Sequence, residues 1–215
     1  MSLCIKNLAI SKHKGDLLFP VISTQVKAGE VLTLMGPSGC GKSTLLSAIA
    51  GHLSPDFTAQ GTIALCGNTI GDLPPHKRQV GILFQEDLLF PHLNIWENLA
   101  FALPNRIKGN ERKDAAMAAL DKVGLLELAH ALPDQISGGQ RARVSLVRML
   151  LAQPKLALLD EPFSKLDKEL RVQFRDWVFT QLKHANIPTI MVTHDSDDVP
   201  PNSQCLTWPW GDNHA

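Results

Sequence analysis

Residues 31–51 read VLTLMGPSGCGKSTLLSAIAG, and this stretch decides the fold. It opens on a short, mostly apolar run, which predicts a short buried strand. A glycine-rich turn follows at once. Leu45, Leu46 and Ile49 then recur at helical spacing until Gly51, which is placed to end the helix. The stretch therefore predicts a strand, a tight turn and an amphipathic helix in direct succession, as in α/β proteins.

The turn itself matches the GxxxxGK[ST] pattern of phosphate-binding loops, although a plain glycine-rich turn is the alternative. Its glycines let backbone N–H groups approach phosphate oxygens, and the helix N-terminus adds a partial positive charge. Lys42 is expected to reach the β- and γ-phosphates of a nucleotide, and Ser43 to ligate Mg²⁺. The predicted nucleotide-binding residues are Gly36, Pro37, Ser38, Gly39, Cys40, Gly41, Lys42, Ser43 and Thr44.

Outside this stretch, strand-like and helix-like runs alternate along the chain. Helical spacing predicts several helices, including one that Asn110 caps and Gly124 ends. The alternation favours an α/β fold: a P-loop NTPase core with a mainly parallel sheet, an antiparallel β subdomain and a helical subdomain over about 86–150. Strands are expected over 3–10, 19–26, 80–84, 156–159 and 189–192, and a hairpin over 61–70.

Composition limits the possible partners. The chain has 215 residues, enough for one ordinary domain, and its 21 basic and 21 acidic residues cancel. Neutrality argues against nucleic acid, and no run approaches the ~20 apolar residues of a membrane span. The N-terminus lacks a signal-peptide pattern, so the chain is expected to stay in the cytosol. Four scattered cysteines predict free thiols: Cys4, Cys40, Cys66 and Cys205.

An acidic pair follows the apolar run 156–159. Asp160 and Glu161 are expected at the carboxyl edge of the sheet, the usual ligand crevice of open α/β folds. In isolation such a pair is usually a solvated turn. Beside a phosphate-binding loop, Asp160 is predicted to hold Mg²⁺ through its water shell, and Glu161 to orient or deprotonate an attacking water.

A second helix N-terminus begins at Ser137-Gly138-Gly139-Gln140. Serine followed three residues later by glutamine is a capping box, and two exposed glycines would make a second anion site. With the motifs above, this box resembles the LSGGQ signature of the ATP-binding cassette (ABC) family, here with Ile136 in first place. The resemblance implies one ATP-hydrolysing domain over 1–215 that uses ATP and Mg²⁺. It also implies a head-to-tail homodimer in the ATP-bound state, in which Ser137, Gly138, Gly139 and Gln140 cover the partner's γ-phosphate.

The resemblance extends to single residues. Gln85 matches a glutamine that contacts Mg²⁺ in the family, and His194 matches a histidine that contacts the γ-phosphate and steadies the glutamate, here Glu161. Residues 164–167 resemble the family's D-loop, except that Lys165 replaces a small residue.

The adenine-stacking position of the family is an aromatic residue near the end of the first strand. Counting back from Gly29-Glu30 places His13 there, with Phe19 as the alternative, although Phe19 begins an apolar run that favours burial.

The resemblance is closest to prokaryotic uptake systems, so the expected role is an ATPase at the cytoplasmic side of the inner membrane. Its partners would be transmembrane permease subunits of a small-solute importer. A soluble ABC-type ATPase without a membrane partner is the alternative. A group of apolar side chains would either line a groove for a permease helix or fill the core of the helical subdomain: Leu88, Leu89, Phe90, Leu93 and Trp96.

Overall fold

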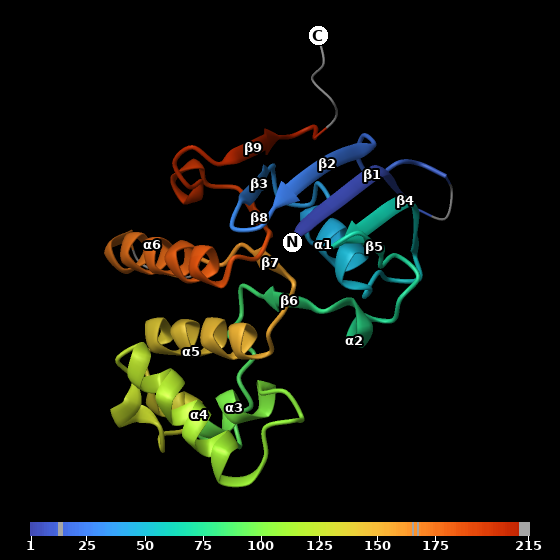
Figure 1. Cartoon of the computed structure of the whole chain (residues 1–215). Helices are drawn as coiled ribbons and strands as arrows, with labels where there is room; N and C mark the ends of the chain where they lie inside the picture. Colours follow the sequence, from blue (N-terminus) through green and yellow to red (C-terminus); the bar gives the residue numbers. More distant parts are fainter. Residues whose placement is uncertain (13–14, 165, 167, 211–215) are drawn as a thin grey trace.

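Two sheets form the framework of the computed structural model, which describes residues 1–12, 15–164, 166 and 168–210 (Figure 1). Within those residues, five strands make a parallel sheet in the order β6-β7-β8-β3-β9. Its strands are β3 (Val31–Met35), β6 (Val80–Leu83), β7 (Leu156–Asp160), β8 (Thr189–Thr193) and β9 (Gln204–Thr207). The predicted α/β fold with a parallel sheet is confirmed.

The second sheet is antiparallel, with the order β2-β1-β4-β5. The register between β1 and β4 shifts between Lys6 and Ala9, and Asn7 takes a φ of 51° there. Gly61 faces this bulge at a φ of 115°, and a Cβ on it would lie 2.4 Å from the Asn7 carbonyl oxygen. Only glycine fits there. The strands are β1 (Ser2–Lys12), β2 (Ile22–Lys27), β4 (Phe57–Leu65) and β5 (Asn68–Thr69).

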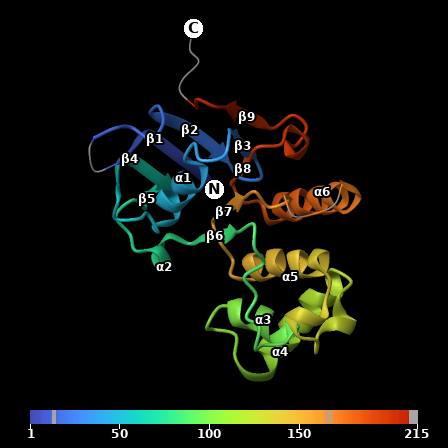
Figure 2. The ribbon, with the colours of Figure 1, turned by 180° about the vertical axis from the view of Figure 1, so that it is seen from behind.

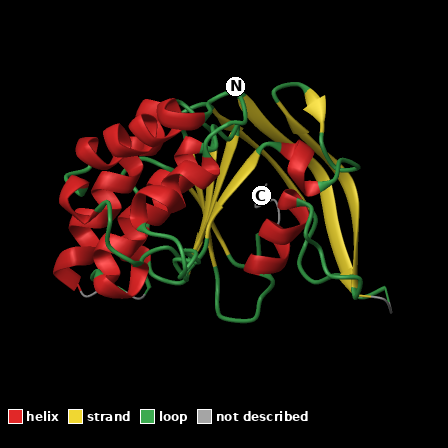
Figure 3. Cartoon of the chain, turned by 90° about the horizontal axis from the view of Figure 1, so that it is seen from below, coloured by secondary structure: helices red, strands yellow, loops and turns green. Residues whose placement is uncertain are grey.

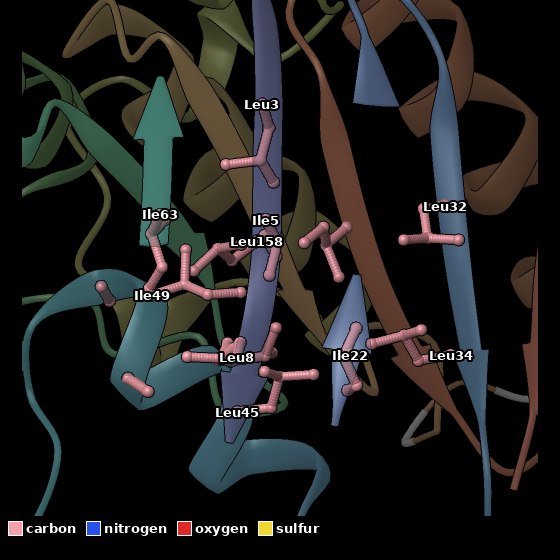
Figure 4. Packing of buried hydrophobic residues seen from close by; sticks show 14 of the residues in the cluster. Leu3, Ile5, Leu8, Ile22, Leu32, Leu34, Leu45, Ile49, Ile63 and Leu158 are labelled. Atoms are coloured by element: carbon pink, nitrogen blue, oxygen red, sulfur yellow. The ribbon is translucent and has the colours of Figure 1, made fainter. Parts of the chain in front are cut away.

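Helix α1 (Lys42–Ala50) lies between the two sheets (Figure 3). Its buried side chains join those of both sheets in one apolar cluster, which Figure 4 shows. The short helix α2 (Pro75–Arg78) follows the antiparallel sheet. Arg78 is buried there, and its guanidinium donates to the carbonyls of Ala48 and Ile49 near the end of α1. The cluster fixes α1, and with it the turn that precedes the helix.

The other face of the parallel sheet is covered by α5 (Gly138–Leu151) and α6 (Lys168–Ala185). Successive residues of a strand face opposite sides, so Leu156 and Leu158 face α1, whereas Ala157 and Leu159 face α5 and α6. Helices α3 (Ile95–Ala102) and α4 (Gly109–Lys122) pack in turn on α5, farther from the sheet (Figure 2).

Two local predictions were wrong, and one strand was not predicted. Helix α4 starts at Gly109 with Lys108 at its N-cap, so Asn110 lies inside the helix and does not cap it. Phe19 lies before β2 instead of starting the strand, because β2 begins at Ile22. Strand β9 was not foreseen, because its residues are mostly exposed and short of apolar side chains.

Candidate nucleotide-binding site

The turn between β3 and α1 leaves the helix N-terminus free of side-chain caps. Gly41 is the N-cap at a φ of 100°, and as a glycine it has no side chain with which to cap α1. A Cβ on Gly41 would lie 2.7 Å from Leu18 Cδ2, so the turn rests closely on its apolar support. The uncapped N–H groups and the helix dipole make this end an anion site.

The Lys42 ammonium lies inside the turn. Its side chain is only 5% exposed, and Nζ donates to the carbonyls of Gly36 at 2.9 Å and Pro37 at 3.1 Å. The same Nζ lies 3.2 Å from Glu161 Oε1. A buried cation held by its own loop is positioned to exchange those partners for phosphate oxygens.

Ser43 and Asp160 bring two oxygens together. Asp160 ends β7 on the face toward α1, and its Oδ1 accepts a hydrogen bond from Ser43 Oγ at 3.2 Å. Burial raises the pKa of the Asp160 carboxyl, while the Ser43 hydrogen bond opposes that shift. A hydroxyl beside a carboxylate is the kind of oxygen pair that Mg²⁺ accepts as ligands in nucleotide sites.

Glu161 and His194 complete the cluster. Glu161 takes a φ of 46°, and its N–H donates to the Val192 carbonyl at 3.0 Å. This uncommon backbone conformation directs the carboxylate back over the turn, where Oε2 lies 3.1 Å from His194 Nδ1. The His194 side chain is half exposed. The carboxylate is therefore held between the Lys42 ammonium and the His194 ring.

Taken together, these residues fit a nucleoside triphosphate with Mg²⁺. The uncapped helix end and the Lys42 ammonium suit phosphate oxygens, and Ser43 with Asp160 suits a hard cation. Glu161 lies beside the same ammonium, 3.2 Å from Lys42 Nζ.

The loop that carries His194 is tied to α6 by contacts that the sequence did not indicate. Arg171 donates to both carboxylate oxygens of Asp198 and lies 2.8 Å from Asp195 Oδ2. The hydrogen bond from Arg171 to Asp198 raises the pKa of the guanidinium. The backbone N–H of Asp197 chiefly lowers the pKa of Asp195, and Arg171 adds to this effect. The run of acidic residues after β8 was a visible signal, but nothing local pointed to Arg171.

The predicted capping box at α5 is confirmed. Ser137 Oγ accepts from the Gln140 N–H at 3.3 Å, and Gln140 Oε1 accepts from the Ser137 N–H at 2.8 Å. The expectation of two exposed glycines was wrong, because Gly138 is exposed but Gly139 is buried. Leu170 packs so closely on Gly139 that an added Cβ would lie 2.6 Å from Leu170 Cδ2. Gly139 is therefore used in the close packing of α5 on α6.

Gln85 lies beside this box. It is exposed and lines a cleft of about 420 Å³ together with Gly138, Arg141 and Pro162. The cleft lining includes neither Ser43 nor Asp160, so within the described residues Gln85 is grouped with the capping box.

Of the two candidates for adenine stacking, His13 lies outside the described residues, as does Lys165. The burial favoured for Phe19 is confirmed. It is 2% exposed and packs edge-to-face on Trp210 at 5.4 Å between ring centroids. The Trp210 indole donates to the Met35 carbonyl at 2.7 Å, so this aromatic pair supports the end of β3.

The apolar residues expected to form a groove divide into two groups. Leu88 and Phe90 line an open groove of about 340 Å³ with Phe101 and Arg148. Leu89 and Trp96 instead pack against the cluster shared by α3, α4 and α5, and Leu93 does not line the groove. The core interpretation is therefore confirmed for Leu89 and Trp96, and the permease-groove interpretation stays a prediction for Leu88 and Phe90.

Comparisons with known proteins identify the family of this chain. The sequence profile of the family described as ABC transporter matches residues 19–164. The chain is 48% identical to an uncharacterised ABC transporter ATP-binding protein, YnjD of Escherichia coli K12, over 99% of this chain and 98% of that protein.

Two import proteins are also similar. The identity is 38% to the spermidine/putrescine import ATP-binding protein PotA of Bacillus thuringiensis Al Hakam, over 93% of this chain and 61% of that protein. It is 42% to the Fe(3+) ions import ATP-binding protein FbpC 2 of Haemophilus influenzae, over 91% of this chain and 55% of that protein. Among the described residues, no helix is long and apolar enough to cross a membrane.

Proposed function

This chain belongs to the ABC transporter family, and we propose that its ATP hydrolysis powers import of a small solute across the cytoplasmic membrane. The observation that carries the proposal is the arrangement around Lys42, whose buried ammonium lies between the phosphate-binding turn and Glu161. The names of PotA and FbpC 2 describe import, and they support the direction of transport.

Each residue of the cluster then has a role. Lys42 and the backbone N–H groups of the turn bind the phosphates, while Ser43 and Asp160 would hold Mg²⁺, which would neutralise charge on the phosphates when bound. Gln85 lines the neighbouring cleft and would contact Mg²⁺ from there. Glu161 accepts the proton of the attacking water or orients it, and His194 holds that carboxylate in place.

We further propose that two copies of the chain associate head to tail when ATP is bound. Ser137 and Gln140 hydrogen-bond to each other at the start of α5. Gly138 lies between them and is exposed at this helix N-terminus. A helix end of this kind suits an anion, and in the dimer that anion would be the nucleotide held by the partner.

The proposed permease docks in the open groove between α3 and α5. Phe101 is 67% exposed and Leu88 is 52% exposed, so the groove offers apolar surface to a helix of a membrane subunit. Docking there would place the chain at the cytoplasmic side of the inner membrane without a span of its own.

The hydrolytic part is tested with Glu161→Gln. The glutamine side chain has the shape of glutamate, but its amide cannot act as a general base. ATP affinity is therefore expected to stay near native while the rate of hydrolysis falls by about 100-fold or more. Binding is measured by calorimetry, turnover by phosphate release, and dimerisation by sedimentation with ATP and Mg²⁺. A Glu161→Gln chain that hydrolyses ATP at the native rate would remove Glu161 from this role.

The transport part is tested by recovery of partner subunits from solubilised membranes. Phe101→Asp is expected to abolish co-purification of a permease, because a charge would enter the apolar groove. Val172→Asp is the matched control, since Val172 is 48% exposed on α6, outside the groove. Recovery of no membrane subunit with the native chain would favour a soluble ATPase.

A further inference from the structure

Asp198 is the centre of a buried polar network between α6 and the loop after β8. It is 1% exposed, and Arg171 donates to it twice, from Nε to Oδ1 at 2.8 Å and from Nη2 to Oδ2 at 2.7 Å. The same Nη2 lies 2.8 Å from Asp195 Oδ2. A buried carboxylate depends on such a partner, and the planar guanidinium serves two carboxylates at once.

The network fixes both residues that flank His194. On one side, Thr193 Oγ1 donates to Asp198 Oδ2 at 2.8 Å. On the other, the Asp195 N–H donates to Thr193 Oγ1 at 3.1 Å, and Asp195 Oδ1 accepts from the Asp197 N–H at 2.9 Å. The His194 ring takes part in none of these hydrogen bonds, and its Nδ1 lies 3.1 Å from Glu161 Oε2.

We propose that Arg171 is a positioning residue that holds His194 against Glu161 through Asp195 and Asp198. This inference rests on the proposed roles of His194 and Glu161 in hydrolysis. Chain and contacts together make a closed path. Along the chain, Glu161 is followed by α6, and His194 lies in the same loop as Asp198. Two contacts close the path, from Arg171 to Asp198 and from His194 to Glu161. Movement at the start of α6 is therefore transmitted to the carboxylate that serves the attacking water.

The test uses Arg171→Lys, which keeps the charge but cannot make the two-pronged contact. We expect the KM for ATP to stay within about twofold, since the phosphate-binding turn is untouched, and kcat to fall by about 10- to 100-fold through misplacement of His194. The matched control is Arg175→Lys. Arg175 lies one turn further along α6 and donates to the Asp197 carbonyl, but it contacts neither Asp195 nor Asp198.

A double-mutant cycle separates positioning from general stability. If Arg171 acts through His194, adding Arg171→Lys to His194→Ala changes kcat by less than about twofold beyond His194→Ala alone. Multiplication of the two separate effects would overturn the proposal, because Arg171 would then act by another route.

A second measurement needs no nucleotide. Hydrogen exchange of the full chain is expected to quicken in residues 193–199 of Arg171→Lys and to stay unchanged in residues 36–44. Native exchange at 193–199 together with native kcat would overturn the proposal. If the wild type hydrolyses no ATP, or Lys42→Ala hydrolyses it normally, the proposed function fails instead, and the exchange result still decides whether Arg171 orders the loop.

Discussion

At the scale of single residues, Lys42 gives a direct test of the phosphate-binding turn. We expect Lys42→Ala to weaken ATP binding by about 100-fold or more, because charge-assisted contacts in a partly buried site are strong. Calorimetric titration measures the loss. Lys27→Ala is the control, since Lys27 is exposed on β2 and pairs with Glu30, away from the turn. Near-native affinity of Lys42→Ala for ATP would remove Lys42 from the site.

Asp195 gives a prediction for pH. The Asp197 N–H and, after it, Arg171 lower the pKa of its carboxyl in the folded chain. Its contribution to stability is therefore fully present above the ordinary pKa of about 3.9 and is lost as the pH falls through the lowered folded value. Urea unfolding is expected to show a difference between wild type and Asp195→Asn that is constant from about pH 5 to 7 and shrinks below about pH 4. A difference that grew toward acid pH would contradict this sign.

The site residues differ in how far sequence could predict them. Lys42, Ser43 and Asp160 lie in or beside motifs whose local geometry fixes their direction, so the pattern was enough to bring them together. Arg171 and Asp198 are 27 residues apart, and their contact depends on how α6 lies across the sheet. A helix pattern indicates which face is buried, but it does not indicate which carboxylate a surface arginine will meet.

At the scale of elements, the bulge between β1 and β4 gives the clearest prediction. Gly61→Ala is expected to lower the free energy of unfolding by about 3 kcal/mol, because its Cβ would collide with the Asn7 backbone. Gly67→Ala is the control: its φ is also positive, at 82°, but no atom lies within 4 Å of the added Cβ. The free energy of unfolding of Gly67→Ala should fall by only about 1 kcal/mol, because of backbone strain. Equal losses in urea unfolding would show that space at Gly61 is not the cause.

Most elements could be predicted because periodicity and burial agree in them. Strands β3, β7 and β8 are apolar runs buried on both faces, and α5 carries a capping box that the sequence spells out. Strand β9 could not be predicted, since an edge strand with exposed side chains has no such pattern. The start of α4 was misplaced for a similar reason: its N-cap, Lys108, has no side-chain capping bond to leave a signal.

At the scale of the whole molecule, the head-to-tail dimer predicts complementation between two inactive chains. Ser137→Arg is expected to block hydrolysis by obstructing the partner's nucleotide, and Lys42→Ala to block it by loss of phosphate binding. A mixed dimer has one doubly damaged site and one intact site, so mixing should restore part of the ATPase activity. Circular dichroism of Ser137→Arg is the control, because the change also removes a helix cap worth about 1 kcal/mol. No recovery in isolated mixed dimers would argue against a site shared between subunits or require both sites to act together.

The position of β3 in the parallel sheet also affects how the chain matures on the ribosome. Met35, just before the phosphate-binding turn, pairs with Thr193 on one side and Thr207 on the other. At translation rates of about 5–20 residues per second, a nascent chain would display that turn for about 10 to 30 s before both neighbours exist. A chain stalled before β9 would therefore carry the whole motif without one of the two strands that pair with β3.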